Sequence, residues 1–231
     1  MERQEAPAPG RVLVLGLGNP GPRYAQSRHN LGATVVSELA RRHGVPLGPG
    51  GKAGGAGGTA RRGRTLRSWA RALGGRRSLQ SLWGRGRVGE RPVILALPQT
   101  YMNASGRAAR ALLRYFDLGP ENLVAVHDDL DLPLGRLKVV VKGGSGGHKG
   151  VASLQAELGS ERFVRLKLGI GRPERGESVE DYVLGRFYPH QRERVVQMVH
   201  MAADCLEVIL GEGAHAAMQK FHTALKEEVE G

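Results

Sequence analysis

The chain has 231 residues, a length that suits one α/β domain, alone or with a small appendage. No apolar run is long enough to span a bilayer, and residues 1–10 lack the apolar stretch of a signal peptide, so we expect a cytoplasmic protein with no membrane contact. Cys205 is the single cysteine, which excludes an intramolecular disulfide and fits a reducing compartment.

The formal net charge of +12 is concentrated in one part of the chain. Residues 48–89 hold Lys52, nine arginines and no acidic residue, whereas the rest of the chain carries 24 basic and 22 acidic residues. The total charge is therefore a weak argument that the folded domain itself binds nucleic acid.

The first predicted strand is the apolar run Val12–Leu15, which leads into the sequence G-L-G-N-P-G-P-R-Y-A-Q-S-R-H-N over residues 16–30. This arrangement would place an amide, an imidazole and a guanidinium at one edge of a sheet, where functional residues often lie. The glycines also match a dinucleotide-binding fingerprint. However, Pro20 and Pro22 occupy the turn at which the required helix would begin, and the acidic residue that should end a second strand is missing, so a nicotinamide site is disfavoured.

A helix is predicted over Gly32–His43, and it ends at Gly44. The following segment, residues 48–89, contains thirteen glycines and few large apolar side chains, so we expect it to be disordered or a loose loop. Its middle, residues 65–73, could form one or two helical turns. The segment is either an arm that attracts RNA or a tolerated surface insertion, and we favour the insertion.

A short strand over Pro92–Leu97 precedes the motif P-Q-T-Y-M-N-A-S-G at residues 98–106, and a helix follows over Ser105–Phe116. Asn103 precedes this helix, where it could act as a capping residue. Its amide could equally hold a substrate carbonyl or a water molecule near the strand ends. The motif alone does not decide between the two.

The next strand, Leu123–Val126, leads into H-D-D-L-D-L-P at residues 127–133. Three carboxylates so close could ligate Mg²⁺, could include one that orients an imidazole for acyl transfer, or could form a solvated acidic turn. No Walker-type phosphate loop accompanies them, so the metal interpretation is the weaker one.

A strand over Leu137–Val141 is followed by the glycine-rich run at residues 143–147, which presents His148. The run also matches the G-x-S-x-G pattern of a nucleophilic serine at Ser145. Repeated glycines generate that match easily, so a flexible loop that approaches the substrate is the simpler interpretation.

The remaining predicted elements are helices over Val151–Leu158, Pro189–Leu210 and about Ala214–Glu228, and a strand over Phe163–Ile170. Alternating strands and helices predict an α/β fold, a single-domain three-layer sandwich with a mixed, largely parallel central sheet flanked by helices. We expect the domain to span residues 11–228, interrupted by the segment 48–89 and preceded by a flexible N-terminus at residues 1–10.

The motifs G-L-G-N-P-G…Y…R-H-N, P-x-T-Y-M-N-x-S-G, H-D-D-L-D-L-P-x-G, G-G-H-x-G and L-G-I-G-R-P occur in this order. Together they closely resemble the bacterial peptidyl-tRNA hydrolase family over essentially residues 12–225, apart from the segment 48–89. The resemblance implies a monomeric cytosolic hydrolase with no metal, cofactor or obligate protein partner. Its substrate would be peptidyl-tRNA, recognised through the acceptor stem and the 3′ end, where the peptide ester is cleaved.

The resemblance also implies residue roles. His29 corresponds to the catalytic histidine and Asp128 to its carboxylate partner. Residues that correspond to substrate-binding positions are Asn19, Tyr24, Met102, Asn103, His148 and Lys149. Residues expected to contact tRNA phosphates are Arg165, Lys138 and Lys142.

Two positions depart from the family pattern. Lys149 stands where the family commonly has an asparagine, and an ammonium group cannot accept a hydrogen bond, so the position can only donate or contact phosphate. Val140 stands where a basic residue is usual, and Lys138 or Lys142 could substitute for it. Because His29 and Asp128 are intact, we expect an active enzyme rather than the alternative, a catalytically inactive RNA-binding relative of the same fold.

Overall fold

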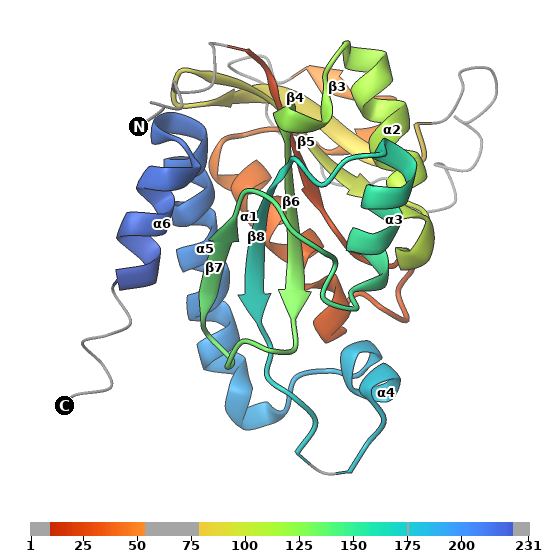
Figure 1. Ribbon diagram of the computed structural model, residues 1–231, viewed down its shortest axis with the longest axis vertical. Helices are drawn as coiled ribbons and strands as arrows, with labels where there is room; N and C mark the ends of the chain where they lie inside the picture. Colours follow the sequence, from red (N-terminus) through yellow and green to blue (C-terminus); the bar gives the residue numbers. More distant parts are fainter. Residues whose placement is uncertain (1–9, 54–78, 175, 224–231) are drawn as a thin grey trace.

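The computed structural model describes residues 10–53, 79–174 and 176–223, and its strands form one mixed sheet (Figure 1). The strands are β1 (Val12–Gly16), β2 (Gly48–Pro49), β3 (Lys52–Ala53), β4 (Ser81–Val88), β5 (Arg91–Pro98), β6 (Leu123–Asp129), β7 (Leu137–Val140) and β8 (Val164–Gly169). Their order across the sheet is β2-β4-β5-β1-β6-β8-β7, with β3 also paired to β4.

The central strands β5, β1, β6 and β8 are parallel, whereas β4 is antiparallel to β5 and β7 is antiparallel to β8. In the middle of the sheet Leu13 pairs with Ile94 on one side and with Leu123 on the other, and all three side chains are fully buried. Continuous apolar strands of this kind are typical of parallel sheets that are covered on both faces. The predicted fold class, a mixed and largely parallel sheet flanked by helices, is confirmed.

Helices cover both faces of the sheet, which gives the three layers (Figure 1). The α-helices are α1 (Leu31–Arg42), α2 (Ser105–Phe116), α3 (Lys149–Leu158), α4 (Val179–Leu184), α5 (Arg192–Glu212) and α6 (Ala214–Thr223). Short 3₁₀ turns are η1 (Arg28–Asn30), η4 (Met102–Ala104), η5 (Pro120–Asn122) and η6 (Pro189–Gln191). The helices α1, α5 and α6 share one apolar core with the sheet, and α2 and α3 share the other.

The prediction of a loose segment over residues 48–89 is wrong at both ends of that segment. Strand β4 pairs with β5 along its whole length, and its Trp83 is buried edge-to-face against Phe116 of α2. A Cβ atom at Gly84 would lie 2.4 Å from the carbonyl oxygen of Pro46, so this glycine permits close packing. Residues 54–78, which include the stretch 65–73, and residues 1–9 lie outside the described part of the chain.

Other element boundaries differ by a few residues. Strand β6 continues to Asp129, so the first residues of the acidic motif lie in the strand and not in a turn after it. Helix α3 begins at Lys149, and Pro189 lies in the 3₁₀ turn η6 that precedes α5. Helix α4 was not predicted. The expected residues 224–228 of the last helix lie outside the described residues. No helix within the described ranges is long and apolar enough to cross a membrane.

Glu38 of α1 has a strongly perturbed carboxyl group. Its side chain is 13% exposed and accepts hydrogen bonds from Arg41 at 2.8 Å and from Arg42 at 3.1 Å. The hydrogen bond from Arg41 is the largest influence on the pKa of Glu38, which falls from 4.5 to about 2 although partial burial opposes the change. Arg42 in turn binds Asp204 of α5, so Glu38 belongs to the ionic network that joins the two helices.

This perturbed pKa predicts a pH-dependent stability. Because the pKa is lower in the folded chain, the ionised carboxylate stabilises the fold above about pH 4.5, and this contribution is lost as the pH falls toward 2. We expect Glu38→Gln to lower the melting temperature by about 2–4 °C at pH 7. The difference between variant and parent should shrink to nothing near pH 2 in thermal unfolding scans. A difference that stays constant with pH would contradict the assignment.

Candidate active site

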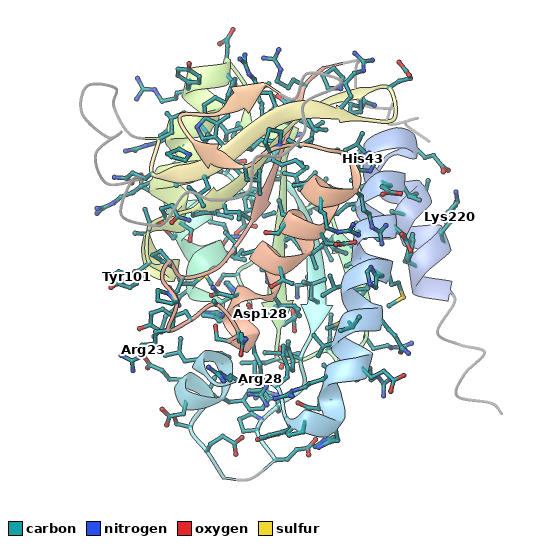
Figure 2. All side chains as sticks on the ribbon, turned by 180° about the vertical axis from the view of Figure 1, so that it is seen from behind. Arg23, Arg28, His43, Tyr101, Asp128 and Lys220 are labelled. Carbon is teal, nitrogen blue, oxygen red and sulfur yellow. The ribbon has the colours of Figure 1, made fainter. Side chains whose placement is uncertain are left out.

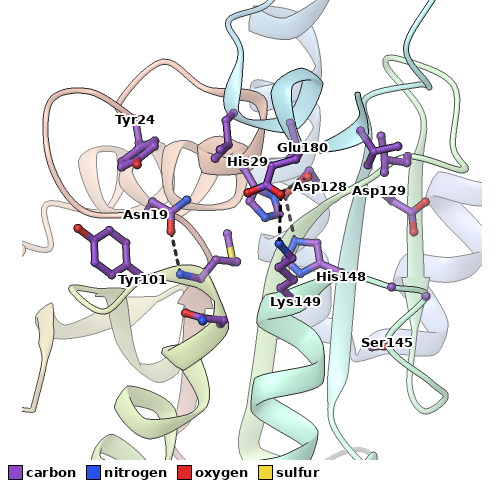
Figure 3. A pocket seen from close by; sticks show the side chains of 18 of the residues that line it. Asn19, Tyr24, His29, Tyr101, Asp128, Asp129, Ser145, His148, Lys149 and Glu180 are labelled. Atoms are coloured by element: carbon purple, nitrogen blue, oxygen red, sulfur yellow. Dashed lines mark hydrogen bonds and ion pairs between the residues drawn. The ribbon is translucent and has the colours of Figure 1, made fainter. Parts of the chain in front are cut away.

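A pocket of about 600 Å³ opens beyond the carboxyl ends of the central strands β1 and β6 (Figure 3). This edge is where open α/β sheets bind ligands. The pocket walls come from the loop after β1, from η1 and η4, from the end of β6, from the glycine-rich loop before α3, and from α4. The sequence-predicted residues that line it are Asn19, Tyr24, His29, Met102, Asn103, Asp128, His148 and Lys149.

His29 and Asp128 form a buried hydrogen-bonded pair. His29 lies in η1 and is 7% exposed, and its Nδ1 lies 2.9 and 3.0 Å from the two carboxylate oxygens of Asp128. A carboxylate only accepts, so Nδ1 carries the proton and Nε2 is left with a free lone pair. The pair therefore has the form of a general base held in one tautomer by a carboxylate.

His148 donates to the same carboxylate from the other side. Its Nδ1 accepts backbone N–H groups of Gly150 and Val151 at 3.1 and 3.2 Å, which caps the first turn of α3. Nδ1 therefore has no proton, and Nε2 carries it and donates to Oδ1 of Asp128 over 3.1 Å. One carboxylate thus receives an N–H from each of two imidazole rings.

Burial alone would raise the pKa of Asp128, but the two imidazoles that face it hold the pKa well below its usual range. The group is 2% exposed and lies at the end of a buried strand, where an unpaired carboxylate would be costly. The hydrogen bonds stabilise the ionised form, and Asp128 is a carboxylate throughout the neutral pH range.

His29, Asp128 and His148 are also the described residues whose ligand atoms lie close enough to hold a metal ion, within 4.8 Å of one another. A metal on Nε2 of His148 would move its proton to Nδ1, where it would meet the N–H groups of Gly150 and Val151. Binding would therefore cost the cap of α3. The donor set fits a hydrogen-bonded array better than a metal centre.

Asn19 has a fixed orientation in the pocket. Its Oδ1 accepts the backbone N–H of Met102 at 2.8 Å, so its NH₂ group is the part left to donate to a ligand. Asn30 clamps the backbone of Asn19 in turn, through bonds of 2.8 and 2.9 Å to its N–H and C=O. These contacts join the loop after β1 to η4 (Figure 3).

Asn103 is exposed and lines the pocket. The capping positions of η4 and α2 are occupied by Tyr101 and Ala104, so the interpretation of Asn103 as a helix cap is wrong. Tyr24 is half-buried at the rim, and Met102 is buried beneath the pocket with its sulfur close to Gly150.

Arg165 is not at the surface, so the predicted phosphate contact does not fit its placement. It is 2% exposed, and its guanidinium donates to the carbonyl oxygens of Gly143 and Gly144 at 2.9 and 2.7 Å. Gln155 of α3 donates to Gly143 as well. Arg165 therefore anchors the loop that presents His148. This loop requires glycine at Gly143, whose φ is +123°.

The predicted lysines fall into two groups. Lys138 and Lys142 are exposed on and just after the edge strand β7, outside the pocket lining. Lys149 is the first residue of α3, and its ammonium lies 3.7 Å from a carboxylate oxygen of Glu180 on α4, across the pocket. Both partners are largely exposed, so the pair contributes little to stability.

Ser145 lines the pocket, but within the described residues no base activates it. Both nitrogens of His148 are engaged with backbone N–H groups and with Asp128, and Nδ1 of His29 is also bound to Asp128. The hypothesis of a nucleophilic serine therefore has no support in the geometry.

Sequence reasoning missed the wall formed by α4, whose Val179, Glu180, Val183 and Leu184 line the pocket. A signal was present: Ser178 and Asp181 have the spacing of a capping box, and the Ser178 hydroxyl accepts the N–H of Asp181 at 3.1 Å. This pattern before an apolar pair could have identified the helix.

Sequence reasoning also missed the role of Arg28, which directly precedes His29 and binds α4. Arg28 lies at the same end of the molecule as Asp128 (Figure 2). It is 2% exposed, and its guanidinium lies 3.9 Å from the ring centre of Tyr182 and 4.7 Å from that of Tyr188. It donates to the carbonyl oxygen of Tyr182 at 3.1 Å. Cation–π contacts of this kind stabilise a buried guanidinium.

His127 is a third buried histidine beside the site. Its Nδ1 donates to the backbone oxygen of Asp128 at 2.7 Å, and its ring packs against that of His148 with 4.7 Å between centres. Burial lowers the pKa of His127 well below its usual value, and the neighbouring His148 adds to this effect. It therefore packs beneath the site as a neutral ring.

Comparison with known proteins shows which family the chain resembles. A family model described as Peptidyl-tRNA hydrolase matches residues 13–229. The peptidyl-tRNA hydrolase of Carboxydothermus hydrogenoformans is 40% identical, with 91% of this chain and 97% of that protein covered. The peptidyl-tRNA hydrolase of Geobacillus kaustophilus is 41% identical, with 84% and 90% covered. A crystal structure of the peptidyl-tRNA hydrolase of Acinetobacter baumannii superposes with a TM-score of 0.73 at 28% identity, covering 91% of this chain and 93% of that one. The chain belongs to the peptidyl-tRNA hydrolase family.

Proposed function

We propose that this chain hydrolyses the ester between a peptide, or an N-blocked aminoacyl group, and the 3′ end of tRNA, which recycles tRNA from prematurely released peptidyl-tRNA. The single observation that carries the proposal is the His29–Asp128 pair at the pocket, with Nδ1 of His29 bound to the carboxylate and Nε2 free. In this arrangement His29 can act as a general base on a water molecule, so the hydrolysis needs no covalent enzyme intermediate.

In the proposed reaction Nε2 of His29 takes a proton from a water molecule as the water oxygen attacks the ester carbonyl. Asp128 stabilises the imidazolium that forms. Collapse of the tetrahedral intermediate breaks the bond to the ribose oxygen, and His29 returns the proton to that oxygen. The products are the free carboxyl group of the peptide and the 3′-terminal hydroxyl group of tRNA.

The amides of Asn19 and Asn103 supply donors for the developing oxyanion. The NH₂ group of Asn19 is free because its Oδ1 is already bound to Met102, and Asn103 is uncommitted to any cap. A preorganised donor of this type contributes about 10²–10³ in rate. The array of His29, Asp128 and His148 needs no metal for this reaction, and action as a cytoplasmic monomer stays a prediction.

On the tRNA side, Lys138 and Lys142 remain the proposed phosphate contacts at the edge strand, and Lys149 is free to donate to a phosphate at the pocket once its exposed pair with Glu180 opens. Phosphate contacts position the ligand without reading its sequence. Contacts that do not read the nucleotide sequence suit an enzyme that must accept many different tRNAs and peptides.

The test is hydrolysis of an N-acetyl-aminoacyl-tRNA by the purified chain and by His29→Ala. We expect the substitution to lower kcat about 10²–10⁴-fold and to leave KM within a few-fold. His215→Ala, which removes an exposed histidine on α6, is the matched control and should behave as the parent. If the parent releases no acyl-amino acid, the chain is the inactive RNA-binding relative instead.

A further inference from the structure

We propose that three arginines on the outer face of α2 form a track for the phosphates of the tRNA acceptor stem. The inference rests on the proposed function, and it adds phosphate contacts on α2 to those proposed for Lys138 and Lys142 at the edge strand β7. The residues are Arg107, Arg110 and Arg114, which we call the α2 stripe.

The α2 stripe follows the helical period. Its members are three and four residues apart, so their side chains emerge from one face of the helix with about 5–6 Å between successive Cβ atoms. The side chains of Arg107 and Arg110 are 69% and 54% exposed, and Arg114 is exposed as well. The opposite face of α2 is buried against the sheet through Ala108, Ala109, Leu112 and Leu113.

The positive charge of the α2 stripe is only partly neutralised. Glu157 of α3 is the acidic partner of two members, at 2.9 Å from Arg110 and at 3.6 Å from Arg107. Among the described residues, no carboxylate lies within ion-pair distance of Arg114. Three guanidinium groups and one carboxylate leave an excess of positive charge along an exposed helix. Guanidinium groups bind phosphate through paired, planar donors.

The α2 stripe lies on a helix that begins beside the pocket. Helix α2 starts directly after η4, which carries Met102 and Asn103 of the pocket lining, and runs away from it beside α3 (Figure 1). The two helices touch closely, since the backbone N–H of Gly106 is bound to the Ser153 hydroxyl at 3.0 Å. A nucleic acid whose 3′ end lies in the pocket and whose helix extends over α2 would therefore meet the arginines in succession.

The opposite lip of the pocket has the opposite charge. The segment 172–181, which leads into and begins α4, contains four acidic residues and two arginines, of which Arg172 is paired with Asp131. Glu180 lines the pocket itself and is 69% exposed. Phosphates are repelled from this lip and attracted to α2, so the charges orient the substrate with its tRNA half over α2.

The experiment compares two substrates on the full chain. One is an N-acetyl-aminoacyl-tRNA, and the other is the same aminoacyl ester on a CCA trinucleotide, which has no stem. For the double variant Arg110→Ala with Arg114→Ala, we expect KM for the tRNA substrate to rise about 5–30-fold at low salt, with kcat unchanged. The salt dependence of log(kcat/KM) should lose about 2 units of slope, because two phosphate contacts disappear. KM for the trinucleotide substrate should stay the same.

The matched control is Arg192→Ala with Arg194→Ala, which removes the same charge from exposed positions on α5, on the other face of the sheet. It should leave KM for both substrates unchanged. Binding of an acceptor-stem RNA hairpin, followed by fluorescence anisotropy, provides a readout that does not depend on hydrolysis. An unchanged KM and unchanged hairpin affinity in the α2 variant would overturn the proposal, as would an equal change for both substrates or for both double variants. Absence of hydrolysis by the parent would refute the proposed function alone.

Discussion

Replacement of Asp128 by asparagine is expected to lower kcat about 10⁴-fold, with little change in KM. The carboxylate accepts one N–H from Nδ1 of His29 and one from Nε2 of His148. An amide has a single oxygen, so its NH₂ group must face one of the two rings. If it faces His29, the imidazole is driven into the tautomer with the proton on Nε2, and the base is lost.

The measurement is single-turnover hydrolysis of an acyl-aminoacyl-tRNA, together with thermal unfolding to check the fold. The matched control is Asp131→Asn, since that carboxylate is 62% exposed on the same strand-end segment and makes no contact with either histidine. It should retain nearly full activity. A loss smaller than tenfold for Asp128→Asn would mean that the tautomer of His29 is fixed by something else.

The second large effect is expected at Gly32, where α1 crosses the sheet. A Cβ atom there would lie 2.1 Å from the carbonyl oxygen of Val126 and 3.0 Å from the amide nitrogen of Leu17, two atoms joined by a backbone hydrogen bond. Both neighbouring atoms belong to the backbone and cannot move aside as a flexible side chain could. Gly32→Ala must therefore push α1 away from β1 and β6. We expect a loss of about 3 kcal/mol or more in the free energy of unfolding.

Activity should fall with stability at this position, because His29 lies three residues before Gly32 and Asp128 lies two residues after Val126. A displacement of about 1 Å between base and carboxylate can cost about 10²-fold in rate. Gly211→Ala is the control: it lies in α5 with open space around it, and it should stabilise the chain by about 0.5–1 kcal/mol. Denaturant unfolding and kcat of both variants test this. A Gly32→Ala variant as stable as the parent would contradict the close crossing.

The pairing of His29 with Asp128 was predicted from the resemblance to the family, and the strand pattern agrees with it because each residue follows an apolar run that reads as a parallel strand. Such strands end at one edge of a sheet, so polar residues at their ends meet. The burial of a single arginine cannot be predicted from such a strand pattern. Arg165 has the residue type of a phosphate contact, and only the packing of the glycine-rich loop over β8 reveals that both of its terminal guanidinium nitrogens donate to that loop.

Strand β4 was missed because glycine serves two physical purposes. The composition of residues 48–89 indicates disorder, but Gly84 and Gly86 are glycines because Pro46 and Val45 pack directly against the strand. Composition averages over a window and cannot distinguish a glycine that permits close packing from one that lowers order. Tertiary contacts decide, and they come from a part of the chain about forty residues away.

The capping of α3 by His148 has a consequence for dynamics. The ring that receives the amide protons of Gly150 and Val151 is the ring that donates to Asp128, so the helix cap cannot open without disturbing the Asp128 carboxylate. Fraying of one helical turn and loss of the reactive arrangement are therefore a single event. The hydrogen-exchange rates of these two amides should report how often the empty enzyme leaves its reactive state.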